Sequence, residues 1–346
     1  MAITGDVTND SGADGQGTLD LVGDGTVSGQ VGAAGASLKE VRAGASGKAA
    51  VFAGDVYAQA MNVSGTGDVA LNGDLNGDLS YGADGTVTLA DTMAVTGDVT
   101  NDAGVDAQGT LTLAGSGAVS GQVGGAGAAL KDVNAGADGS ASVFSSDVYT
   151  ESFNITGTGA AALGGTLNGA LSYEGAGTVT LADGMTVTGN VTNDTLTDGQ
   201  GTLVLAGDSA VLAQIGADGA ALGAVDAGAD GAAVGFDNDV YAQTLNVTGT
   251  GTVALGATLH GAISYDGDGT VALADTMAVT GGVANDTGID GQGTFDFAGS
   301  GTVGGQVGAA GASLKAVSAG VDSTVVTLFD DVYAQALNIM GTGTAA

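Results

Sequence analysis

Aspartates recur in register along the chain, and carboxylates at such regular spacing could bind a cation. Successive members of each set lie 92 residues apart, as Asp10 and Asp102 do. Ca²⁺ needs several oxygen ligands, which carboxylates and turn carbonyls can supply. No copy matches a β-helix calcium nonapeptide or an EF-hand loop. The pattern therefore predicts weak Ca²⁺ sites, with turn capping and solubility as the alternative role. The predicted residues are Asp10, Asp14, Asp102, Asp106, Asp194, Asp198, Asp286 and Asp290.

Tyrosines share the same spacing and are the most regular aromatic residues. The first set, each member of which ends an Asp-Val-Tyr sequence, comprises Tyr57, Tyr149, Tyr241 and Tyr333. The second set comprises Tyr81, Tyr173 and Tyr265. An exposed ring could serve as a sugar-binding platform. The alternative, which we favour, is a core corner with the hydroxyl reaching water.

His260 is the only histidine, and the chain has no cysteine. The chain therefore lacks the residues that a nucleophilic triad or a histidine- or thiolate-based metal site requires. Because Asn76 and Asn168 stand at the same repeat position, we expect His260 to lie at a variable surface turn. Paired-carboxylate catalysis remains open by residue type, but nearly interchangeable repeats argue against a single active site. The sequence thus predicts no enzyme, no catalytic residues and no cofactor, and places any localised function where the copies differ or at the ends.

The elements that position these residues follow from a repeat. Residues 85–102 read GTVTLADTMAVTGDVTND and return at 177–194 and 269–286, which defines copies 1–92, 93–184, 185–276 and a partial copy 277–346. Short stretches of alternating apolar and polar residues between glycine-rich turns indicate β-strands with one buried face. We assign a strand also to 124–133, where a helical turn is the alternative.

These strands predict one elongated all-β domain over 1–346, a parallel β-solenoid of about 15 coils. Each coil is expected to hold about 23 residues and three short strands, with four coils per 92-residue copy. An array of β-sandwich domains is the alternative. The 67 glycines and the absence of tryptophan suit a narrow core of small apolar residues.

The charge balance constrains partners. The chain carries 38 acidic and 5 basic residues, a formal net charge of −33, which repels nucleic acid and anionic membranes. No apolar run reaches the length of a membrane-spanning helix, and no signal peptide is seen in these residues. Met1 occupies the repeat position of Met93, so we expect a fragment of a longer chain or a subunit that stacks end to end.

Several phrases resemble a known family. The series GTLDLVGDGTVSGQVG, LKEV, VFAGDVYAQAMNVSG and GTVTLADTMAVTG is similar to the passenger repeats of rickettsial surface-antigen autotransporters, the large outer-membrane proteins A and B of that group. The resemblance implies an exported cell-surface passenger used in adhesion or as a surface layer. It carries over no residue roles, because no receptor-binding motif of that family is recognised here.

These observations together predict a structural or adhesive protein of the bacterial cell surface, outside the cell. The first alternative is a subunit of an extracellular filament built by end-to-end stacking. A polysaccharide-acting enzyme is the second and is disfavoured. The expected partners are other copies of the chain and a host-cell receptor or surface polysaccharide, without nucleic acid and without membrane insertion of this segment.

Overall fold

The computed structural model describes all residues, 1–346, as strands joined by turns. It divides into two compact units, Met1–Ser172 and Tyr173–Ala346. The boundary falls inside the repeat copy 93–184, so the units do not coincide with the repeats. The prediction of one continuous domain stays a prediction. The structure contains no helix long and apolar enough to cross a membrane.

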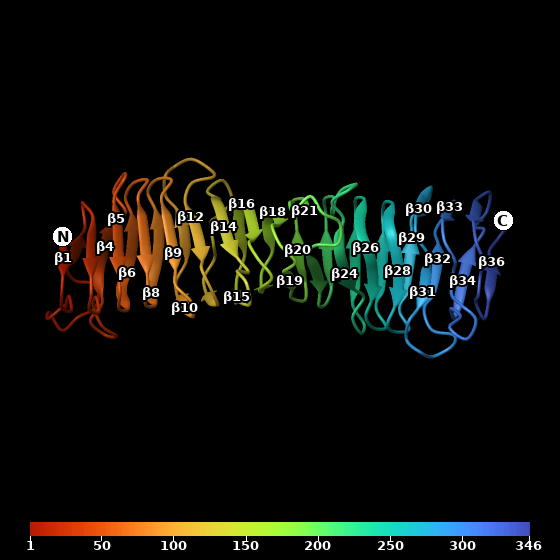
Figure 1. The fold of residues 1–346 in the computed structure, drawn as a ribbon, viewed down its shortest axis with the longest axis horizontal. Helices are drawn as coiled ribbons and strands as arrows, with labels where there is room; N and C mark the ends of the chain where they lie inside the picture. The colour runs from red at the N-terminus through yellow and green to blue at the C-terminus, as the bar shows by residue number, and fades with distance from the viewer. The chain divides into compact units, whose positions relative to one another are not determined.

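In the first unit, strands pair in two parallel ladders. One ladder contains β1 (Ala2–Ile3), β3 (Gly25–Val27), β5 (Ala49–Phe52), β7 (Asp68–Leu71), β9 (Thr86–Leu89), β12 (Thr110–Leu113), β14 (Leu130–Ala135) and β16 (Val148–Ile155). The other contains β2 (Thr18–Asp20), β4 (Leu38–Ala43), β6 (Val56–Val63), β8 (Leu75–Tyr81), β10 (Met93–Val95) with β11 (Val99–Asn101), β13 (Gly117–Val119), β15 (Ala141–Phe144) and β17 (Ala160–Leu163). Figure 1 shows these strands stacked one after another within the unit.

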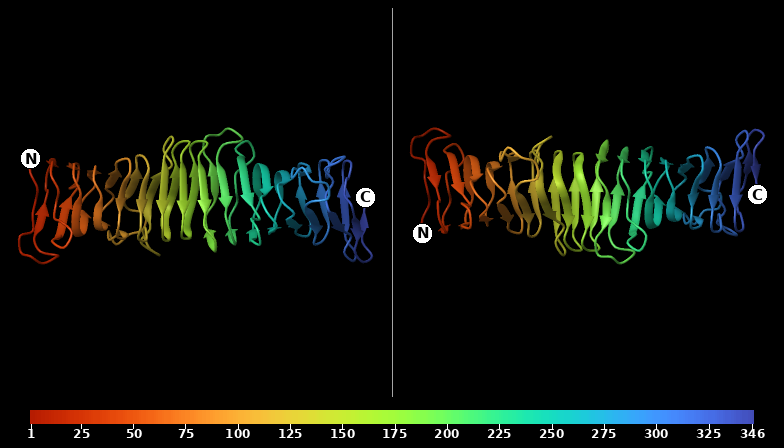
Figure 2. Two further views of the ribbon diagram at one scale, coloured as in Figure 1. Left: turned by 90° about the horizontal axis from the view of Figure 1, so that it is seen from below. Right: turned by 90° about the horizontal axis from the view of Figure 1, so that it is seen from above.

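The second unit repeats this arrangement, as both views in Figure 2 also show for its strands. Before it, β18 (Leu167–Tyr173) spans the unit boundary. One ladder contains β19 (Thr178–Leu181), β22 (Thr202–Leu205), β24 (Leu222–Ala227), β26 (Val240–Val247), β28 (Leu259–Tyr265), β30 (Met277–Val279) with β31 (Val283–Asn285), β33 (Gly301–Val303), β35 (Val325–Leu328) and β37 (Thr344–Ala345). The other contains β20 (Met185–Val187) with β21 (Val191–Asn193), β23 (Ser209–Val211), β25 (Ala233–Phe236), β27 (Thr252–Leu255), β29 (Thr270–Leu273), β32 (Thr294–Phe297), β34 (Ala316–Ala319) and β36 (Leu337–Ile339).

This pairing confirms the all-β parallel solenoid. Paired strands lie about 20 residues apart, and the chain makes about 17 turns. No helix forms at 124–133. The strand assignment holds from Leu130, where β14 begins, but 124–129 form a turn closed by backbone hydrogen bonds between Gly125 and Ala128.

The number of turns, about 17, exceeds the expected 15 coils of about 23 residues with four per copy. The expected three strand positions per coil are present, for example at Val27, Val31 and Val41.

A 92-residue copy makes four turns and then advances by one strand position, because Val95, the counterpart of Ile3, stacks four turns above Val7. Four successive pairings lead from β1 to β9, and the chain then crosses to the other ladder at β10. Ala94 in β10 stands 92 residues after Ala2 in β1. The second unit shows the same shift, since β22 and its counterpart β32 belong to different ladders. Equivalent residues of successive copies in one unit therefore lie at different strand positions around the tube.

Apolar side chains of successive turns stack in register inside the tube. In the first unit, Val27, Phe52, Leu71 and Leu89 are consecutive Cα partners, and each is 0% exposed. The alternation of apolar and polar residues puts such a column under every strand, because neighbouring side chains point to opposite faces. Complete burial of one such side chain contributes about 1.5–3 kcal/mol.

The tyrosines of the second set are buried in the core near a corner of the tube. The Tyr81 hydroxyl donates to the Thr110 carbonyl at 2.8 Å, and Tyr173 and Tyr265 repeat the contact with Thr202 and Thr294. All three tyrosines are 0% exposed, and this burial raises their pKa well above the usual value. The prediction of a core corner is confirmed for this set, but the hydroxyl is bonded to backbone and does not reach water.

A glycine completes each of these corners. Gly109 has a φ of +84°, and a Cβ at this position would overlap the Tyr81 ring. Glycine alone meets both demands, because the left-handed conformation is strained for other residues and the ring leaves no room. Gly201 and Gly293 stand in the same relation to Tyr173 and Tyr265.

Buried asparagines fix the loops that protrude from the tube. Asn101 is 5% exposed, and its amide nitrogen donates to the carbonyls of Val105 and Ala129, both at 2.8 Å. Asn193 and Asn285 repeat this bridge. The side chain thus ties its own loop to the following turn, which the turn preference of asparagine alone did not predict.

Candidate functional site

One predicted set of aspartates caps the backbone between turns. One carboxylate oxygen of each aspartate accepts a hydrogen bond from the backbone N–H of the residue 23 positions further on. Asp106 accepts from Ala129 at 2.6 Å, and Asp198 accepts from Ala221 at 2.7 Å. Asp290 accepts both the hydroxyl and the N–H of Ser313. These two donors, the hydroxyl first, lower the pKa of Asp290. Asp14 makes the same bond with Ser37 at 2.8 Å.

The remaining predicted calcium ligands lie elsewhere on the same loops. Asp102 accepts the Ser80 hydroxyl at 2.6 Å, and Asp286 accepts the Ser264 hydroxyl at 2.7 Å. Asp10 and Asp194 are exposed. No three His, Cys, Asp or Glu side chains gather in a way that could hold a metal ion. Ca²⁺ binding stays a prediction: a melting temperature that rises with Ca²⁺ would support it, and one unchanged by a chelator would refute it.

The second unit contains a groove of about 520 Å³ over β26 and β28. This lies within the usual range of about 300–1,000 Å³ for small-ligand sites. Its lining comes from four places along the chain: the loop at Asp198, the turn at 217–221, the strands that carry Tyr241 and His260, and Thr280 after β30. The turn is closed by backbone hydrogen bonds between Ala217 and Ala220 at 3.2 and 3.0 Å.

Two aromatic rings form one wall of the groove. Tyr241 and His260 are register partners on β26 and β28, and their rings stack with centroids 4.0 Å apart at an angle of 3°. Adjacent parallel strands are separated by about 4.8 Å, so side chains at partner positions can stack directly. The expectation that His260 lies at a surface turn is wrong, because it stands within a strand and is half-buried against Tyr241.

The floor of the groove is shaped by a bulge. The pairing of β26 with β28 shifts register between Tyr241 and Thr244, as bulges do when one strand has an extra residue. Gly261 lies at this irregularity, and a Cβ there would overlap the Ala242 carbonyl oxygen. The backbones can therefore approach closely only because position 261 is glycine, and Ala242 closes the floor as a buried residue.

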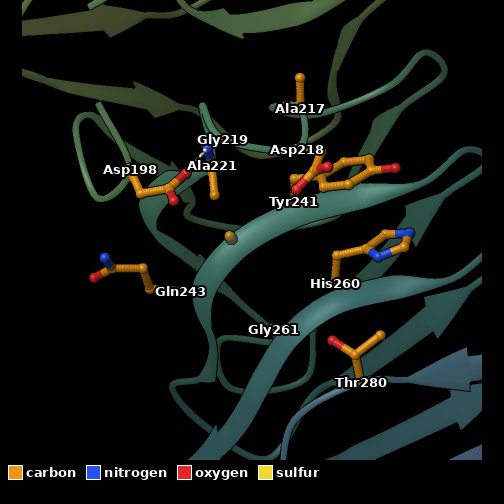
Figure 3. A pocket seen from close by; sticks show the side chains of 11 residues that line it. Asp198, Ala217, Asp218, Gly219, Ala221, Tyr241, Gln243, His260, Gly261 and Thr280 are labelled. Carbon is orange, nitrogen blue, oxygen red and sulfur yellow. Dashed lines mark hydrogen bonds between the residues drawn. The ribbon is translucent and has the colours of Figure 1, made fainter. Parts of the chain in front are cut away.

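Polar side chains surround the remaining sides. Figure 3 shows Asp198 and Gln243 on one side of the groove, with Tyr241 and His260 on the other. Asp198 uses one oxygen for the Ala221 N–H. The remaining groove side chains that can form hydrogen bonds contact no protein partner in this way: Asp218, Tyr241, Gln243, His260 and Thr280. Donors and acceptors of this kind are available to a ligand.

The groove coincides with differences between the copies. In the first copy, Tyr57 and Gln59 match Tyr241 and Gln243, but Ala34 replaces Asp218 and Asn76 replaces His260. Tyr57 and Asn76 are again register partners, so the substitutions change the side chains at a retained backbone position.

Sequence reasoning singled out Tyr241, His260 and Asp198 without bringing them together. It missed Asp218, Gln243 and Thr280. The available signal was the difference between copies, because Asp218 stands where the other copies have alanine. Neither Gln243 nor Thr280 stands out when the copies are compared, so the sequence carries no such signal for them.

Comparison of the chain with models of protein families, with characterised proteins and with solved structures found no match.

Proposed function

We propose that this chain is a structural and adhesive protein of a bacterial cell surface, a repeat segment of an autotransporter-like passenger or surface layer. The observation that carries the proposal is the offset of successive 92-residue copies by one strand position around the tube. Because equivalent residues of successive copies within a unit lie at different strand positions around the tube, one chain presents the same side chains on more than one face. A protein with one active site gains nothing from such display, whereas a protein that attaches at several points gains avidity.

The surface chemistry supports the same proposal. The formal net charge of −33 keeps the chain soluble and opposes contact with anionic surfaces. Attachment in this case depends on specific patches and not on bulk charge attraction. Long strands recur with the same bounds in the first three copies, at Val56–Val63, Val148–Ile155 and Val240–Val247, while exposed loop and strand residues vary, so recognition can change without disturbing the core.

The test is adhesion of the folded chain to cells. Beads coated with the full chain are expected to remain on cultured epithelial cells several-fold more often than albumin-coated beads. The matched control is Leu89→Asp, which puts a charge into a column where Leu89 is 0% exposed and so unfolds the first unit. Retention equal to that of albumin would refute the proposal. Sedimentation of long, uniform filaments would instead favour the filament subunit.

A further inference from the structure

We propose that the groove beside Tyr241 and His260 binds a neutral sugar residue of a glycan. This inference names a ligand class for the adhesive function proposed above and rests on it for its biological meaning. The binding itself concerns one groove in the second unit and can be measured without cells.

The aromatic wall supplies the apolar contact. The two rings stack on one another, and both line the groove. A pyranose ring has a face of C–H bonds that packs on an aromatic ring, while its hydroxyls point outward. The half-buried rings thus offer a platform that is already formed, which lowers the ordering cost of binding.

The polar side chains match the outward hydroxyls. Gln243 offers both a donor and an acceptor, the His260 ring has two nitrogens that can form hydrogen bonds, and Thr280 has a hydroxyl. Asp218 and the second oxygen of Asp198 are acceptors. A sugar hydroxyl donates and accepts at once, so a ring with several hydroxyls can use this mixed set, whereas a purely apolar or purely acceptor-bearing ligand cannot.

Charge selects among sugars. Asp198 and Asp218 both line the groove, and none of the ion pairs of the chain involves a groove residue. Carboxylates without a nearby cation repel uronic acids, sialic acids and phosphorylated sugars. Two carboxylates would also accept a cation, so a basic ligand is the competing occupant that the test must distinguish.

The copies provide an internal control. The first copy keeps the tyrosine and glutamine but has Ala34 and Asn76 in place of Asp218 and His260. If both differing residues contribute, the groove in the third copy binds and its counterpart in the first does not. The double substitution Ala34→Asp with Asn76→His is then expected to create a second site.

The experiment uses the full chain and four neutral disaccharides: lactose, cellobiose, maltose and N,N′-diacetylchitobiose. Because His260 is the only histidine, its imidazole gives one isolated NMR signal that reports on the groove. At least one disaccharide is expected to shift this signal in a saturable way, with a millimolar dissociation constant. Calorimetric titration of Asp218→Ala and of Tyr241→Ala should show binding weakened about tenfold or more.

Two variants serve as controls. Gln59→Ala, in the first copy, should leave the affinity unchanged, and the Ala34→Asp, Asn76→His variant should double the number of sugars bound. Circular dichroism establishes that each variant remains folded. Retained binding together with failed bead adhesion would refute the proposed function and support the sugar site.

Three results would overturn the inference. The first is no shift of the His260 signal with any of the four disaccharides. The second is a shift with argininamide or putrescine only, which would identify a cation site. The third is undiminished sugar binding in Tyr241→Ala, which would place the sugar elsewhere on the chain.

Discussion

The buried Tyr81 hydroxyl makes a sharp prediction for stability at alkaline pH. Its bond to the Thr110 carbonyl measures 2.8 Å, and Tyr81→Phe removes this bond while keeping the ring. A typical hydrogen bond contributes about 0.5–1.5 kcal/mol to stability. At neutral pH we therefore expect the free energy of unfolding of the first unit to fall by about 1 kcal/mol.

Raising the pH reverses this order. Burial raises the pKa of Tyr81 well above 10.0, so the folded protein keeps the phenol neutral while the unfolded chain ionises. The contribution of a group with a raised pKa is fully present below the unfolded pKa of about 10 and is lost as pH rises towards the folded value. The wild type then loses about 1.4 kcal/mol per pH unit at this residue, and the phenylalanine variant does not. Since the ionisation loss reaches about 1 kcal/mol near pH 10.7, the two stability curves should cross at about that pH.

The measurement is urea unfolding followed by far-ultraviolet circular dichroism, at several pH values from neutral to strongly alkaline. Tyr57→Phe is the matched control, because the half-buried Tyr57 hydroxyl has no hydrogen bond within the protein. This variant should stay within about 0.5 kcal/mol of the wild type at neutral pH. If Tyr81→Phe differs from the wild type by the same amount at every pH, the assignment of a neutral, backbone-bonded phenol is wrong.

Three further predictions concern the turns. Asn101→Ala should lower the free energy of unfolding by about 2 kcal/mol, measured in urea, because two loop carbonyls lose their donor; an unchanged midpoint would contradict the bridge. Gly109→Ala should cost more than Gly35→Ala in the same assay. Both glycines have a positive φ, but a methyl group at 109 meets the Tyr81 ring and one at 35 meets nothing within 4 Å. Equal losses would show that backbone strain alone decides. Ser313→Ala should raise the pKa of Asp290, followed by NMR, because it removes the hydroxyl that is the main cause of its lowered value. In the wild type this contribution to stability is present above the unfolded pKa of about 3.9 and is lost as pH falls through the lower folded value. An unchanged pKa in the variant would refute the assignment.

The period-two pattern was sufficient to predict the strands. Val41 and Ala43 in β4, for example, are buried while Arg42 between them is exposed, as the alternation indicates. Glycine at the corners and the absence of long helical windows then left few folds other than a solenoid. The repeat of the sequence also predicted which residues are equivalent, such as Tyr81, Tyr173 and Tyr265, although not that their hydroxyls bond to backbone.

Tertiary structure alone decided how the copies meet in space. Turn length varies with the corners, from 18 residues between Val69 and Val87 to 25 between Thr26 and Val51. A sequence period of 92 residues does not reveal that each copy advances by one strand position after four turns. The groove depends on these lengths, because Asp198, Asp218 and His260 approach one another only through register. Alternation specifies which side of a strand a residue faces. Which strand then lies beside it is set by corner lengths and bulges, and the stacking of His260 on Tyr241 is a consequence of that packing.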